Sequence, residues 1–392
     1  MKIIFPRMET TYFHKAYDGG CKFIQQLGEE FVKKGHEVEI VTTKLRDKPN
    51  LRKDAHNGVK HVFILPKYTG KRIIPLNMFY KMIFSYNLNK YLKKQKFDIL
   101  HTSEAFAYHY LHNKKRKKVV FQSWALEPFY GNECCSQKGL KKMYVKLALQ
   151  KPWGYCLRHA DAVTADNGSQ IHEIIKLDVD KKKIEFIPLG IPFKNLQKLK
   201  KKFKSIRKEL GFKKEDLVLL SVGQMIPEKG IDEIIKAFGL VKKEIKNAKL
   251  IMIGKGILEE KMHKMIKDMG LEKDFVHLKN VPEENLFDYH FSSNIFINGT
   301  HTNYPTISIQ EALATGLPIV SGKEIFLVKN GINGYNVGIN NPKGIAEGVI
   351  KIYESGKMKQ MGKASVKMVE SSDYETIAEI AIKVYKKLLN QK

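Results

Sequence analysis

Three short segments of the chain combine glycines with a lysine or a carboxylate in arrangements that suit phosphate binding. The first is Gly19-Gly20, which precedes a run whose apolar residues Phe23, Leu27 and Phe31 follow helical spacing. Glycines at a helix N-terminus let backbone N–H groups approach an anion, and the helix dipole adds positive potential there. A tight turn without a ligand explains the pair equally well, because two glycines are less specific than a full phosphate fingerprint.

The second segment places Lys229 between Gly223 and Gly230, directly after a run that is typical of a buried strand. A lysine in a glycine-flanked loop at the carboxyl end of a strand is well placed to neutralise a diphosphate. Solvent-exposed lysines are equally common in a chain so rich in lysine. The loop alone therefore leaves both interpretations open.

The third segment runs from Asn303 to Gly316 and predicts the start of a helix. In a binding interpretation, the backbone amides of Thr306 and Ile307 contact phosphate oxygens, and Glu311 accepts hydrogen bonds from ribose hydroxyls. In a purely structural interpretation, Ser308 and Glu311 form a capping box. This window by itself favours neither.

Three further patterns carry less information. Gly254-Lys255-Gly256 follows a predicted strand, but Glu259 stands where a dinucleotide fingerprint needs its third glycine, which argues against a dehydrogenase. The Asp178-Val179-Asp180 sequence lies in a lysine-rich turn and favours a solvated loop over a metal site. His101 follows another predicted strand, where it either faces a ligand or ends the strand.

Short β-rich runs alternate with longer helical patterns along the whole chain, which predicts an α/β fold with parallel sheets. The alternation occurs twice, so we expect two Rossmann-like domains, at 1–192 and 193–374. The last helix, within 375–392, is expected to pack back on the first domain. Ligands of such proteins bind in a cleft where the two sheets face each other.

The composition limits the partners. The 392 residues carry 69 basic and 41 acidic side chains, a net charge of +28 at pH 7. The surplus is mainly lysine, a point charge that suits phosphates better than base edges, and no nucleic-acid-binding motif is present, so no nucleic-acid partner is expected. The 4 cysteines form no CxxC pattern, and neither a signal peptide nor an apolar run of roughly 18 residues occurs, which predicts a cytoplasmic protein.

Together these segments resemble the family 4 glycosyltransferases of the GT-B fold. The matching pieces include GGCKFIQQLGEEFVKKGHEVEIVTT, VGQMIPEKG, KLIMIGKG, NGINGYNV and, above all, IFINGTHTNYPTISIQEALATGLPIVSG. The resemblance implies two Rossmann-like domains facing across a cleft. It also implies transfer of a sugar from a nucleotide-diphosphate donor, with retention at the anomeric carbon and without an essential metal or other cofactor.

The resemblance also implies roles for single residues. Lys229 falls on the family's diphosphate-binding lysine and Glu311 on the second glutamate of its EX7E motif, so these two are expected to be catalytic. The family's glycine-rich loop, which faces the donor phosphates, falls on Gly19 and Gly20. The remaining donor-binding residues expected from the motifs are Gly223, Gln224, Asn303, Thr306 and Ile307.

Three positions depart from the family pattern. Asn303 stands where the first glutamate of EX7E is usual, Gln224 where an arginine often accompanies the lysine, and Trp124 where a histidine often lies. Trp124 and His101 are expected on the acceptor side. These departures support an alternative, a catalytically silent GT-B protein that binds nucleotide or glycan as a partner subunit.

The acceptor is expected to be a glycan, a glycolipid or another lipid-linked molecule. Residues 76–92 predict an amphipathic helix whose apolar face is flanked by Lys81, Lys90, Lys93 and Lys94. Such a helix either packs on the core or lies on an anionic membrane, which leaves peripheral membrane attachment open.

Overall fold

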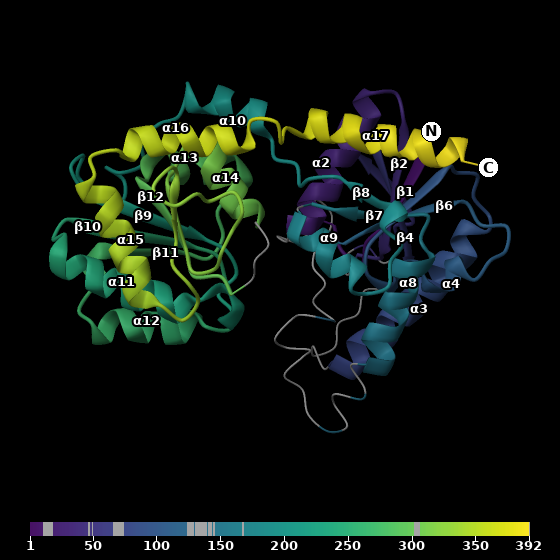
Figure 1. Ribbon diagram of the computed structural model, residues 1–392, viewed down its shortest axis with the longest axis horizontal. Coiled ribbons are helices and arrows are strands. Elements are labelled where there is room, and N and C mark those ends of the chain that lie inside the picture. Colours follow the sequence, from purple (N-terminus) through teal and green to yellow (C-terminus); the bar gives the residue numbers. More distant parts are fainter. Residues whose placement is uncertain are drawn as a thin grey trace. The chain divides into compact units, whose positions relative to one another are not determined.

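The structure of the chain is a computed structural model that describes residues 1–10, 19–45, 48, 50–65, 74–123, 129, 139, 143, 146–166, 168–301 and 306–391. The chain forms two units (Figure 1), Met1–Gly190 with Tyr374–Lys392 and Ile191–Asp373. The predicted borders lie at 192/193 and 374/375. Each unit contains one mainly parallel sheet covered by helices, so the α/β class expected from the alternation of strands and helices is confirmed.

The N-terminal unit is built on an eight-stranded sheet with the order β3-β4-β2-β1-β5-β6-β7-β8, parallel except for the antiparallel pair β3–β4. Its strands are β1 (Lys2–Pro6), β2 (Glu37–Thr43), β3 (Lys53–His56), β4 (Val59–Leu65), β5 (Ile99–Thr102), β6 (Lys118–Gln122), β7 (Ala162–Ala165) and β8 (Ile184–Phe186). Its α-helices are α2 (Gly19–Lys33), α3 (Ile74–Leu92), α4 (Tyr108–Leu111), α8 (Lys151–His159), α9 (Gly168–Ile175) and α17 (Tyr374–Asn390).

The inner strands of this sheet are apolar on both faces, because helices cover both. Ile3, Ile4 and Phe5 of β1 are all fully buried. On one face, α2 buries Leu27 and Phe31, which are spaced one helical turn apart. Side chains at i and i+4 share one face of a helix, so this spacing directs both residues onto the sheet.

The C-terminal helix α17 also packs on this unit, beside α2. The ring of Tyr385 lies 5.7 Å from Phe31 and 5.8 Å from His101, centroid to centroid, and is fully buried. At the surface, Lys34 pairs with Glu379 at 2.8 Å. The last helix therefore completes a core whose other members come from the first third of the sequence.

The C-terminal unit has a six-stranded parallel sheet with the order β11-β10-β9-β12-β13-β14. The strands are β9 (Leu217–Val222), β10 (Ala248–Ile253), β11 (Phe275–Leu278), β12 (Ile295–Asn298), β13 (Ile319–Ser321) and β14 (Gly334–Asn336). The α-helices are α10 (Phe193–Lys200), α11 (Ile231–Glu244), α12 (Glu259–Asp268), α13 (Glu283–Ser292), α14 (Ile307–Thr315), α15 (Pro342–Glu354) and α16 (Met358–Val369).

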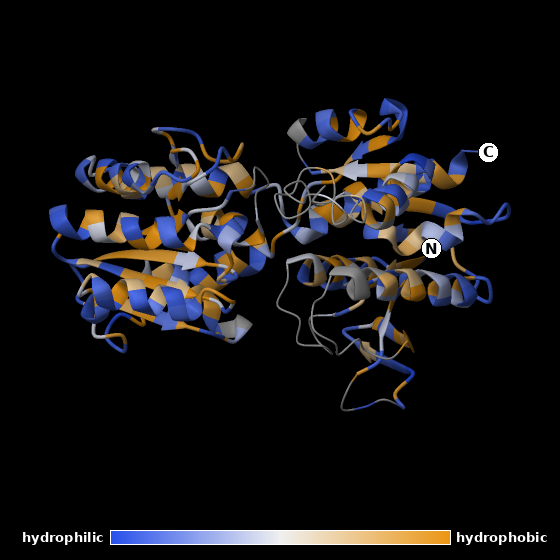
Figure 2. Cartoon of the chain, turned by 90° about the horizontal axis from the view of Figure 1, so that it is seen from below, coloured by the Kyte–Doolittle hydropathy of each residue, from blue (hydrophilic) through white to orange (hydrophobic). Residues whose placement is uncertain are grey.

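Hydrophobic residues of this unit gather in the strands and on the inward sides of its helices, while hydrophilic residues face outward (Figure 2). The strand order places β9 and β12 side by side at the middle of the sheet. The carboxyl ends of two adjacent parallel strands lie on the same side of the sheet, so the loops that follow the strands are neighbours. No helix in the described part of the chain is both long and apolar enough to cross a bilayer.

Candidate functional site

The loop that carries Lys229 starts where β9 ends. Gly223 and Gln224 follow the strand, and a short 3-10 helix at Pro227–Lys229 leads into α11. Gly230 links the two helices in the left-handed conformation, with φ of 61°. A Cβ atom at Gly230 would lie 2.1 Å from the carbonyl oxygen of Gly299, so only glycine fits here.

The same loop is tied to the segment that follows β12. The backbone N–H of His301 donates to the carbonyl of Glu228 at 3.0 Å. The His301 ring lies 3.3 Å from the Glu233 carboxylate, measured from Nε2 to Oε1. These two contacts and the close approach of Gly230 to Gly299 fix the Lys229 turn against the neighbouring loop.

Helix α14 begins a few residues further along. Thr306 is its N-cap, with extended backbone angles and a hydroxyl that accepts from the Ile309 N–H at 3.4 Å. Ile307 is therefore the first helical residue. The capping box considered for Ser308 and Glu311 is wrong, because Ser308 already lies inside the helix and Thr306 takes the cap position.

Glu311 lies in the second turn of α14 and is 3% exposed. A carboxylate is rarely buried without polar or charged partners, so the interior of this unit is polar around Glu311. The structure thus separates Glu311 from a capping role and leaves a buried carboxylate in the second turn of the helix that follows β12.

Within the C-terminal unit, the predicted donor-binding residues fall into two groups. Gly223, Gln224 and Lys229 follow β9, whereas Thr306, Ile307 and Glu311 belong to the helix that follows β12. Because β9 and β12 are paired in parallel, the two groups both lie at the carboxyl ends of these strands, with His301 between them. Asn303 lies outside the described residues.

The predicted residues of the N-terminal unit are placed separately. Gly19 and Gly20 are helical residues of α2, and the part of the chain directly before them lies outside the described residues. Trp124 lies outside the described residues. His101 is only 2% exposed, with its Nε2 atom 2.9 Å from Gln122 Oε1 and its Nδ1 atom in a hydrogen bond with the Tyr385 hydroxyl.

Burial lowers the pKa of His101 from 6.5 to about 4, although its hydrogen bond with Gln122 opposes the shift. The imidazole is therefore neutral at pH 7. The Gln122 oxygen only accepts, so Nε2 carries the hydrogen and Nδ1 accepts from Tyr385. Both ring nitrogens are thus engaged inside the unit, so His101 lies in the interior and does not face a ligand, and its side chain bonds to Tyr385 and Gln122.

Helix α3 divides its apolar residues between the core and the surface. Phe84, Leu88 and Leu92 are buried, as expected for core packing. Phe79, near the start of the helix, is 67% exposed, and Tyr86 is 48% exposed. Core packing therefore accounts for Phe84, Leu88 and Leu92 and not for Phe79 or Tyr86.

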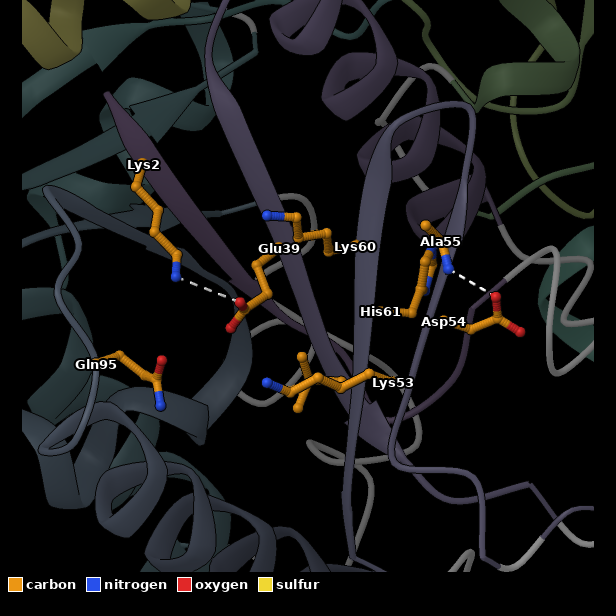
Figure 3. A pocket seen from close by; sticks show the side chains of 9 residues that line it. Lys2, Glu39, Lys53, Asp54, Ala55, Lys60, His61 and Gln95 are labelled. Atoms are coloured by element: carbon orange, nitrogen blue, oxygen red, sulfur yellow. Dashed lines mark hydrogen bonds and ion pairs between the residues drawn. The ribbon is translucent and has the colours of Figure 1, made fainter.

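A pocket of about 410 Å³ lies elsewhere in the N-terminal unit (Figure 3). Lys2, Lys53 and Lys60 line it around the buried Glu39, which pairs with Lys2 at 3.5 Å and accepts from the Tyr91 hydroxyl at 2.5 Å. Lys2 starts β1, so the pocket is at the amino ends of the strands. Ligands of open α/β sheets bind at the opposite, carboxyl ends.

Metal ligands do not gather anywhere in the residues that the structure describes: no three His, Cys, Asp or Glu side chains form a group able to hold an ion. The Asp178–Asp180 sequence forms a turn, in which the Asp180 side chain accepts from the Lys182 N–H at 2.9 Å. This contact matches the loop interpretation.

Two site features were not anticipated from the sequence. One is the pairing of His301 with Glu233, and the other is the contact between Gly230 and Gly299. The sequence signal for the second was present, since both glycines follow predicted strands or turns. The partner of each becomes evident only when β9 and β12 are placed next to each other.

The fold, and the residues at the carboxyl ends of β9 and β12, are those of a GT-B glycosyltransferase, and comparisons with known proteins agree. The family model described as "Glycosyltransferase Family 4" matches residues 17–194, and the one described as "Glycosyl transferases group 1" matches residues 202–368. The chain belongs to glycosyltransferase family 4, as the motifs indicated.

Curated relatives are distant. An alpha-monoglucosyldiacylglycerol synthase of Acholeplasma laidlawii is 24% identical over 83% of this chain and 84% of the relative. An uncharacterized glycosyltransferase of Methanocaldococcus jannaschii is 26% identical, but this chain spans only about half of that relative, 48%.

Solved structures show the same fold over the whole chain. Sucrose-phosphate synthase from Thermosynechococcus elongatus superposes with a TM-score of 0.82 at 17% identity and covers 100% of both chains. Anabaena Alr3699/HepE in complex with UDP-glucose superposes with a TM-score of 0.72 at 15% identity and covers 98% of this chain and 100% of the other. The expected GT-B fold is thus confirmed.

Proposed function

We propose that this glycosyltransferase moves a sugar from a nucleoside-diphosphate donor to a glycan, glycolipid or other lipid-linked acceptor, with retention and without a metal ion. The observation that carries the proposal is that Lys229 and the N-terminus of α14 both follow the carboxyl ends of the paired central strands β9 and β12. A related fold has been solved with UDP-glucose, and a relative is named for glycolipid synthesis. Both support the proposed substrate classes.

In this proposal, negative charge develops on the leaving diphosphate as the bond between the sugar and its phosphate oxygen breaks. The Lys229 ammonium and the first amides of α14 stabilise that charge, the kind of electrostatic assistance that is often the largest contribution to catalysis. Because the neighbouring loop fixes the Lys229 turn, this stabilisation needs little reorganisation during the reaction.

We assign Glu311 to the hydroxyl groups of the donor. A carboxylate accepts hydrogen bonds from hydroxyl groups and so positions a ribose or sugar ring. We assign no side chain of the site the role of a covalent nucleophile. The acceptor oxygen therefore forms the new bond to the anomeric carbon on the face that the diphosphate leaves, and its proton passes to a leaving phosphate oxygen.

The central test compares Lys229→Ala with Lys236→Ala, a control at an exposed lysine of α11. Hydrolysis and transfer are measured with UDP-, GDP- and ADP-sugars, and circular dichroism checks folding. We expect Lys229→Ala to lose at least about 100-fold in turnover, since one preorganised donor of this type is worth about 10²–10³-fold. Unchanged turnover would refute the assignment of Lys229.

The second candidate function is a silent GT-B protein, for which Gln224 provides the specific observation. Gln224 directly follows Gly223, at the position where an arginine often accompanies the diphosphate-binding lysine, so Lys229 has no second cation at that position. Nucleotide binding by the wild-type protein without hydrolysis or transfer from any of the three donors would favour this candidate. Transfer from any one of them would exclude it.

For the acceptor, we propose a lipid-linked molecule presented at an anionic membrane on the cytoplasmic side. Phe79 and Tyr86 provide exposed apolar surface on α3, and Lys90 lies 4.5 Å above the Tyr86 ring. Aromatic and lysine side chains together suit a membrane interface. Co-sedimentation with phosphatidylglycerol vesicles at low salt tests this, and Phe79→Ser with Tyr86→Ser is expected to reduce it.

A further inference from the structure

The segment Gly254-Lys255-Gly256 lies along the loop that leads to Lys229. It follows β10, the strand next to β9, and its backbone bonds directly to that loop. The Met225 N–H donates to the Lys255 carbonyl at 3.0 Å, and the Leu258 N–H donates to the Met225 carbonyl at 3.0 Å.

The two glycines permit this contact. A Cβ atom at Gly254, whose φ is 143°, would lie 1.8 Å from the Gly223 carbonyl oxygen, and one at Gly256 would lie 2.3 Å from that of Met225. Two backbone segments thus touch without intervening side chains. Any displacement of the 254–256 segment moves the start of the Lys229 loop.

Two polar side chains hold the 254–256 segment from its other side. His277 of β11 lies with Nε2 2.8 Å from the Gly254 carbonyl oxygen, and Glu259 of α12 accepts from the Gly256 N–H at 2.9 Å. One side chain therefore fixes a carbonyl at one end of the segment, and the other fixes an N–H at the opposite end.

Each of these side chains has a partner of its own. The Glu259 carboxylate pairs with Lys279 at 2.9 Å, and these hydrogen bonds lower the pKa of Glu259, which keeps it ionised. The His277 Nδ1 atom lies 3.0 Å from His263 Nε2. Since the Gly254 carbonyl only accepts, His277 donates to it through Nε2.

We propose that His277 and Glu259 are positioning residues of the donor site, which hold the 254–256 segment in place and thereby the Lys229 turn. Neither residue touches the reacting atoms. The inference rests on the proposed function, because it assigns the Lys229 loop to the donor diphosphate. It also explains why Glu259 stands where a dinucleotide fingerprint has a glycine.

The test measures binding of UDP, GDP and ADP by calorimetry in His277→Leu, His277→Gln and wild-type protein. We expect His277→Leu to weaken the tightest of these nucleotides about 3- to 10-fold, the equivalent of one lost neutral hydrogen bond. Glutamine retains an N–H donor and is expected to restore affinity to within about 2-fold of wild type, by the same reasoning. His172→Leu is the control, since His172 makes a similar bond to Gly168 in the other unit.

Variants of Glu259 provide a second, independent test in case His277→Leu misfolds. Glu259→Gln keeps an acceptor for the Gly256 N–H and is expected to bind like wild type, whereas Glu259→Ala is expected to bind more weakly. Hydrogen exchange of residues 223–230 gives a readout without any ligand, and it is expected to accelerate in His277→Leu and Glu259→Ala.

The outcomes separate the two ideas. Wild-type protein that binds none of the three nucleotides would refute the proposed function, while faster exchange at 223–230 would still support the positioning role. Nucleotide affinity and exchange unchanged in both His277→Leu and Glu259→Ala would overturn the inference, as would an equal loss of affinity in the His172→Leu control.

Discussion

The buried imidazole of His101 predicts that the N-terminal unit loses stability in mild acid. Burial lowers the pKa of His101 from 6.5 to about 4 in the folded protein, whereas the unfolded chain keeps the ordinary value. Between these two pKa values the unfolded state binds more protons, so the free energy of unfolding falls as pH falls from 6.5 toward 4. Linkage gives a loss of about 2 kcal/mol at pH 5 relative to pH 7.5 from this one group.

Tryptophan fluorescence follows this unit selectively, because the chain's 2 tryptophans, Trp124 and Trp153, both lie within Met1–Gly190. Urea unfolding is measured at pH 7.5, 6 and 5 for the wild type, for His101→Gln and for the exposed control His172→Gln. We expect His101→Gln to be less stable at pH 7.5 yet to lose about 2 kcal/mol less on acidification.

The control His172→Gln is expected to follow the wild-type pH dependence. If His101→Gln shows the same slope as the wild type, the buried neutral histidine does not govern acid stability, and the reasoning from burial fails. A steeper slope in His101→Gln would reverse the sign and refute it as well.

Further substitutions test local geometry. Gly230→Ala places a Cβ atom against the Gly299 carbonyl at a positive φ, so we expect the C-terminal unit to lose about 2 kcal/mol or more in urea unfolding followed by circular dichroism. Gly211→Ala, also at positive φ but with open space around it, is expected to lose less. Thr306→Ala removes the cap of α14 and should cost about 1 kcal/mol, which Thr306→Ser largely restores. Lys34→Ala removes an exposed ion pair with α17, and a change above about 1 kcal/mol in thermal unfolding would contradict that weak contribution.

The fold was largely predictable because its strands and helices carry local signals. A run such as LVLLSV at β9 is apolar on both faces, and only a strand covered by helices on both sides suits it. The order of strands and helices then follows from the alternation along the chain. The position of Lys229 at the carboxyl end of β9 was equally accessible from the sequence.

The surroundings of the predicted site residues were less predictable, because they depend on residues far away in sequence. The environment of His101 is set by Tyr385, which is 284 positions away. The cap of α14 shows a different limit: the Ser308–Glu311 spacing fits a capping box, but the N-cap is two residues earlier, at Thr306. A local pattern can be satisfied at two neighbouring positions, and only backbone geometry decides between them.

Glu259 shows a third limit. Its position suggested a defective glycine fingerprint, yet its carboxylate accepts the Gly256 N–H and pairs with Lys279. A glycine fingerprint describes one of several residue patterns that allow the backbone to follow a given loop. In this chain a side-chain acceptor serves where the fingerprint has a glycine.

The return of α17 to the N-terminal unit has a consequence for how the chain folds during synthesis. The C-terminal unit is continuous, from Ile191 to Asp373, and is complete before Tyr374–Lys392 emerges from the ribosome. The N-terminal unit, although made first, lacks the helix that covers Phe31 until Tyr374–Lys392 has been made. Domains made first usually fold first, and contacts between distant residues form slowly. We therefore expect the unit made first to reach its native state last, with the surface that α17 covers accessible to chaperones until α17 has been made.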